Sequence, residues 1–112
     1  MNWNKLNNLE IENKERYVQL FSNIVNKIRN YEYDFEPGLK EESDHFLVHE
    51  ENQVFGPMVH IVPKPAFDLF KEMKSKDPNQ LLGFSVLANK TTRVSCFGIP
   101  CNLLAKSITK AF

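Results

Sequence analysis

Apolar side chains recur between residues 17 and 28 with the period of an α-helix. They follow the spacing i, i+3, i+4, i+7, i+8 and i+11 at Tyr17, Leu20, Phe21, Ile24, Val25 and Ile28. This spacing lines one face of a helix and fits no strand, so we expect a helix over residues 13–30 that buries one side. Asn13 is expected to cap its start, and Lys27 and Arg29 favour its end.

The next segment changes from helical to strand-like spacing. Residues 31–36, "YEYDFE", alternate aromatic and acidic side chains, which is typical of a strand. Pro37 and Gly38 are expected to end that strand in a turn. The acid-rich stretch that follows, up to residue 44, is compatible with a short helix or with a loop, and "HFLVHE", residues 45–50, predicts another strand.

Residues 53–63, "QVFGPMVHIVP", also resemble a strand, but Gly56 and Pro57 interrupt it. Because proline cannot donate a hydrogen bond to a ladder, the interruption marks an edge, a bulge or a turn. The secure part of this strand is "MVHIV", residues 58–62.

Two more helices are expected in the second half of the chain. The first covers residues 65–76, with apolar positions at helical spacing: Ala66, Leu69, Phe70 and Met73. The second begins after Pro100 and carries a stripe that we expect to be buried: Cys101, Leu104, Ala105, Ile108 and Phe112.

The runs "LLGFSVLA" and "TTRVSCF" flank a turn at residues 89–91 and predict a hairpin. If paired residues have numbers that sum to 180, Phe84 meets Cys96 and Val86 meets Val94, so that the apolar partners share one face. The chain of 112 residues is therefore expected to be one α+β domain over residues 1–112, with residues 1–12 flexible. We expect a mainly antiparallel sheet with about three helices packed on it.

Composition narrows the classes of function. No apolar run approaches the roughly 20 residues of a membrane span, and the polar start "MNWNKLNNLE" has no leader pattern, so we expect a cytoplasmic protein without membrane contact. Two cysteines are too few for a disulfide framework. Fourteen basic and fourteen acidic residues cancel, which argues against a nucleic-acid partner.

The charges are nevertheless unevenly placed. One basic residue, Lys40, lies among eight acids: Glu32, Asp34, Glu36, Glu41, Glu42, Asp44, Glu50 and Glu51. From residue 52 onward, eight bases face three acids. The bases are Lys64, Lys71, Lys74, Lys76, Lys90, Arg93, Lys106 and Lys110. This asymmetry predicts an acidic surface that docks on a basic one, with Glu41, Glu42 and Asp44 as its binding residues, unless the acids only form a solvated edge that prevents sheet aggregation.

The pair of cysteines in "CFGIPC" does not have the spacing of a redox motif. Four residues separate Cys96 from Cys101, and zinc would need two further ligands. We expect both thiols to be buried packing residues. The alternative is a reactive Cys101 whose pKa is lowered at a helix start.

The histidines give weak signals for chemistry. His45 and His49 would coordinate one metal ion if they lay on a helix, but on a strand they are roughly 13 Å apart on one face. His60, inside an apolar strand, is expected to be a hydrogen-bonded core residue. We therefore expect no metal and no cofactor.

The sequence favours a small cytosolic regulator that binds another protein, such as an inhibitor, an immunity factor or a phage protein that modifies its host; a homo-oligomer is also compatible with it. Two alternatives come from other classes. One is a small enzyme using His49, His60 or Cys101. The other is a nucleic-acid binder whose basic segment after residue 52 includes Lys90 and Arg93.

Overall fold

The computed structural model describes residues 10–111 and, from residue 108 on, the backbone only. The expectation that residues 1–12 are flexible lies largely outside this range. In chain order the elements are α2 (Lys14–Arg29), β1 (Gly38–Glu41), β2 (His45–Asn52), β3 (Gly56–Pro63), the 3-10 helix η1 (Lys64–Ala66), α3 (Phe67–Lys76), β4 (Ser85–Leu87), β5 (Arg93–Cys96) and α4 (Cys101–Ala111). None of the helices in the described range is both long enough and apolar enough to cross a membrane.

The five strands form one sheet in the order β1-β2-β3-β5-β4. All neighbours are antiparallel except β3 and β5, which are parallel. The predicted α+β domain with a mainly antiparallel sheet and three helices is therefore confirmed. The parallel pair arises because the chain crosses over through α3 and returns as a hairpin, whose more buried strand, β5, lies against β3.

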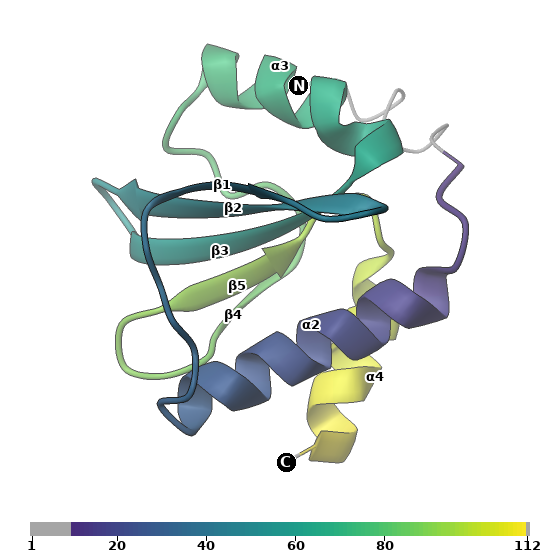
Figure 1. The fold of residues 1–112 in the computed structure, drawn as a ribbon, viewed down its shortest axis with the longest axis vertical. Helices are drawn as coiled ribbons and strands as arrows, with labels where there is room; N and C mark the ends of the chain where they lie inside the picture. Colours follow the sequence, from purple (N-terminus) through teal and green to yellow (C-terminus); the bar gives the residue numbers. More distant parts are fainter. Residues whose placement is uncertain (1–9, 112) are drawn as a thin grey trace.

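Helices cover both faces of the sheet (Figure 1), with α3 on one side and α2 and α4 on the other. Because side chains alternate along a strand, neighbouring residues of β2 face different helices. The ring of Phe46 stacks on that of Phe67 in α3, with ring centroids 4.0 Å apart. The ring of His45 instead contacts that of Tyr17 in α2 edge-on, with centroids 6.1 Å apart. Coverage on both faces explains why every residue of β3 from Met58 onward is buried.

The predicted helix over residues 13–30 is confirmed as α2, which buries five of the six stripe residues and leaves Leu20 half-buried. Asn13 stands at the N-cap position, but it has a left-handed backbone with φ of 59° and its side chain makes no capping bond. The prediction of a side-chain cap is therefore wrong.

Two predictions about residues 31–44 are also wrong. Residues 31–36 are not a strand; they cross from α2 to the sheet without joining a ladder (Figure 1). The alternation survives because Tyr33 and Phe35 turn inward while the acids stay exposed. The stretch after Pro37, expected as a helix or a loop, instead begins with β1, since residues 38–41 pair with Phe46–His49 of β2.

The turns follow from local polar chemistry. Asn52 closes the β2–β3 hairpin, since its Oδ1 accepts hydrogen bonds from the backbone N–H groups of Val54 and Phe55 at 2.8 and 2.9 Å. Gly56 and Pro57 therefore follow a turn and start β3. The hairpin of β4 and β5 has the predicted register, with Val86 opposite Val94. The helix predicted over residues 65–76 is confirmed as η1 and α3.

Candidate functional site

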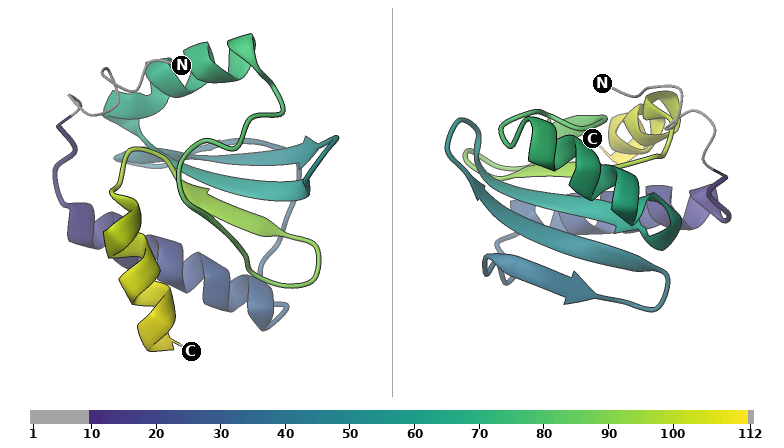
Figure 2. Two further views of the ribbon diagram at one scale, coloured as in Figure 1. Left: turned by 180° about the vertical axis from the view of Figure 1, so that it is seen from behind. Right: turned by 90° about the horizontal axis from the view of Figure 1, so that it is seen from above.

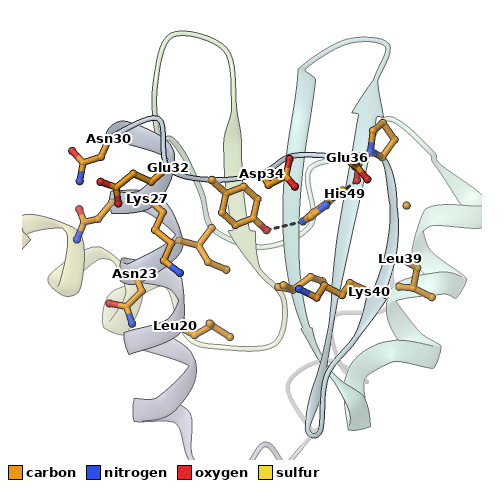
Figure 3. A pocket seen from close by; sticks show the side chains of 16 residues that line it. Leu20, Asn23, Lys27, Asn30, Glu32, Asp34, Glu36, Leu39, Lys40 and His49 are labelled. Carbon is orange, nitrogen blue, oxygen red and sulfur yellow. Dashed lines mark hydrogen bonds between the residues drawn. The ribbon is translucent and has the colours of Figure 1, made fainter.

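An open groove of about 830 Å³ lies between α2 on one side and β1 and β2 on the other. Its apolar lining includes Leu20, Ile24 and Leu47, and its cationic lining consists of Lys27 from α2 and Lys40 from β1. Figure 3 looks into this groove. The groove lies where the chain passes from α2 to β1, and residues of both elements and of the segment between them line it.

Residues 32–36, which we call the lip, border one end of the groove (Figure 3). His49 of β2 holds the lip in place through three contacts. Its Nδ1–H donates to the carbonyl of Glu36 at 2.9 Å, and its Nε2 accepts from the Tyr33 hydroxyl at 2.6 Å. The ring of Phe35 stacks on the imidazole, with ring centroids 5.2 Å apart.

These contacts indicate the tautomer of a neutral His49. Because Nδ1 carries the proton that the Glu36 carbonyl accepts, Nε2 of a neutral His49 is an acceptor. Burial raises the pKa of Tyr33 to about 12, so its hydroxyl keeps the proton that it donates. His49, a candidate catalytic residue from the sequence, thus has both ring nitrogens engaged in positioning the lip.

The three acids expected to form the binding site all have partners within the chain. Asp44 accepts from Arg16 at 2.6 and 3.2 Å, and this guanidinium holds the pKa of the Asp44 carboxyl well below its usual range. Glu41 pairs with Lys64 at 2.8 Å, and Glu42 lies 3.6 Å from Lys40. These carboxylates are therefore at least partly neutralised before any partner arrives.

The acids of the lip are different. Glu32, Asp34 and Glu36 are exposed, and within residues 10–111 their carboxylates form no ion pair. Figure 3 shows them along one end of the groove. These three acids belong to the acidic segment noted in the sequence, but the prediction named Glu41, Glu42 and Asp44 as the binding residues. The signal that could have found them is their alternation with Tyr33 and Phe35, which turns every acid outward.

A second polar cluster lies under α3. His60 Nε2 is 2.7 Å from Glu50 Oε1, and its Nδ1 is 2.7 Å from the Ser95 hydroxyl. Serine, histidine and a carboxylate are the residue types of a hydrolytic triad. Here, however, the exposed fraction is 0% for His60 and 1% for Ser95, and the ring of Phe70 lies 5.3 Å from the imidazole. No substrate atom can reach this serine in the folded protein.

The two cysteines differ in exposure. Cys96 is fully buried, and this burial raises the pKa of its thiol. Cys101 is exposed at the start of α4, so the prediction that it lies on the buried stripe is wrong. Cys101 belongs to the first turn after Pro100 and faces outward. Among the described side chains of the predicted stripe, Leu104 is the only one that is fully buried. Phe112 lies outside the described residues.

The basic segment does not form one surface. Lys90 is exposed in the β4–β5 turn, and the guanidinium of Arg93 lies 5.5 Å from the ring centroid of Phe55. Lys74 on α3 is largely buried beside Glu50 at 2.6 Å. Lys106 is on α4, on the opposite side of the sheet from α3 (Figure 1). The positive residues are thus distributed over separate faces.

In the described part of the chain, no group of three or more His, Cys, Asp or Glu side chains is placed so that it could hold a metal ion. Comparisons with protein-family models, curated proteins and solved structures found no match.

Proposed function

We propose that this protein is a small cytosolic regulator that binds another protein, and that a basic segment of this partner docks on the lip of the groove. The observation that carries the proposal is the set of three exposed carboxylates, Glu32, Asp34 and Glu36, which have no ion-pair partner within the described chain. They stand beside a groove whose lining includes the apolar side chains of Leu20, Ile24 and Leu47 and the cationic side chains of Lys27 and Lys40.

Electrostatics favours a basic partner. Alternate residues of an extended chain are about 6–7 Å apart, which is inside the Debye length of about 8 Å at physiological ionic strength. The carboxylates of the lip therefore repel one another, and a cationic segment relieves that repulsion. Complementary charge of this kind mainly accelerates the encounter, and its effect decreases with added salt.

The lip also offers an aromatic anchor. Tyr31, directly before it, is 82% exposed although it has a large apolar ring. Tyrosine is enriched among residues that dominate binding energy, because its ring buries a large area with little entropy loss. An exposed tyrosine next to unpaired acids supports a protein partner over a small ligand.

The test is binding of a fluorescent, flexible peptide of Lys, Gly and Ser, measured by anisotropy at low and at physiological salt. The lip variant carries Glu32→Gln, Asp34→Asn and Glu36→Gln. The control variant removes as many exposed acids away from the lip, through Glu12→Gln, Glu15→Gln and Glu51→Gln. We expect the lip variant to bind roughly tenfold more weakly at low salt, while the control variant retains the wild-type affinity apart from a small change.

Equal weakening in both variants would mean that only net charge matters and would contradict the proposal. Equal binding of a matched peptide with Glu in place of Lys would contradict it as well.

A further inference from the structure

The sheet ends at β1, beside the groove. All four residues of β1 are exposed, and among the described residues β1 pairs with β2 alone. In the right-hand view of Figure 2, no helix or strand of the described chain lies beyond it. An edge strand leaves every second N–H and C=O without a ladder partner, and a further extended chain can pair with these groups.

The side chains of β1 alternate between the two faces of the sheet. Lys40 is opposite Leu47, and both line the groove on the α2 side. Leu39, which also borders the groove, is opposite Val48 and lies on the α3 face of β1, because side chains alternate along a strand. It is 57% exposed. A strand added next to β1 would keep this alternation and would extend both faces by one row.

Building on the proposed function, we propose that the partner's basic segment binds as an extended strand along β1. Its basic side chains turn to the α2 side, toward the lip, and its apolar side chains turn to the α3 side, against Leu39. The segment thereby combines backbone pairing for affinity with alternating side chains for specificity.

Charge selects this occupant over a second copy of the chain. In an antiparallel pair of β1 strands, each lip would lie near Glu41 and Glu42 of the other copy, and in a parallel pair the two lips would meet. Both arrangements bring acids together. The charged residues of β1, Lys40 and Glu41, likewise oppose unspecific edge pairing. Because Lys40 faces the α2 side, the basic side chains of the binding strand have to lie beside Gly38 and the lip and not beside Lys40.

The experiment uses the wild-type protein, the lip variant and three fluorescent peptides. The parent peptide alternates Lys and Val; one derivative is N-methylated at every Lys and the other at every Val. In a strand, the N–H groups of alternate residues point to the same side, so one derivative loses the bonds to β1 and the other loses only solvent contacts. We expect one derivative to bind at least about tenfold more weakly than the other.

Three other results would contradict the inference or the proposed function. If both derivatives bind as well as the parent, strand pairing is excluded, while the proposed function stands. If the parent peptide binds the wild type no better than it binds the lip variant, the proposed function fails, and this inference fails with it. If the protein without peptide sediments as a dimer that the parent peptide dissociates, a second copy occupies β1 and the inference is overturned.

Discussion

The imidazole of His60 and the carboxylate of Glu50 are joined by a hydrogen bond of 2.7 Å beneath α3. The second carboxylate oxygen of Glu50 lies 2.6 Å from Nζ of Lys74 on α3, and the other ring nitrogen of His60 contacts Ser95 on β5. One buried network thus links β2, β3, β5 and α3.

The first prediction is that Glu50→Ala destabilises the fold. The change leaves His60 and Lys74 without their shared acceptor, so we expect unfolding in urea to lose about 2 kcal/mol of free energy. Glu51→Ala, on the same strand but exposed, is the control and should stay within about 0.5 kcal/mol of wild type. Similar stability of the two variants would show that the network contributes little.

The second prediction concerns acid. Burial alone raises the pKa of Glu50, but the hydrogen bonds from His60 and Lys74 outweigh burial and lower it to about 2 from 4.5. The folded-state pKa is thus below the unfolded one, so the stabilisation is present above about pH 4.5 and is lost as the pH falls toward 2. The free energy of unfolding of Glu50→Gln should therefore fall less than that of the wild type as the pH is lowered through this window.

Urea titrations at several pH values within that window measure the difference in slope. Asp44, paired with Arg16, titrates in the same direction. The residual slope of Glu50→Gln should therefore decrease further when Asp44→Asn is added. An identical slope in wild type and Glu50→Gln would exclude Glu50 as a source of acid sensitivity.

The third prediction is that the two thiols label at very different rates. Cys101 is exposed and should react at once with a thiol reagent in the native state. Cys96 has no exposed surface and should react only through unfolding, slower by a factor on the order of a thousand or more. Timed mass spectrometry measures both rates. Fast labelling that persists in Cys101→Ser would place Cys96 on a mobile element.

The fourth prediction is that His49 orders the lip. His49→Ala removes the contacts to Tyr33, Phe35 and the Glu36 carbonyl, so the amide of Glu32, which donates to the Lys27 carbonyl at 2.8 Å, should exchange its hydrogen faster. Tyr33→Phe removes one hydrogen bond and should have a smaller effect, worth about 1 kcal/mol. Tyr31→Phe, at an exposed ring, is the control. Unchanged exchange in His49→Ala would mean that the lip is held by other groups.

Periodicity determined most of the secondary structure. The stripe from Tyr17 to Ile28 and the symmetric spacing around residue 90 are local patterns, and each specified its element and the face that it buries. The prediction of a strand over residues 31–36 was wrong, because an alternating pattern indicates which side chains are buried and does not require hydrogen bonds to a neighbouring strand. Packing on His49 satisfies the same pattern without a strand.

Only the tertiary structure decided which acidic side chains are free of ion pairs within the described chain and so available to a partner. Arg16 and Asp44 are 28 positions apart in the chain, and Glu41 and Lys64 are 23 apart, yet each pair is in contact. The sequence places eight of the fourteen acids between residues 31 and 51, but it cannot separate the paired carboxylates from those of the lip. The reason is physical: hydrophobic periodicity acts between neighbours along the chain, whereas an ion pair depends on distances that the packed sheet and helices set.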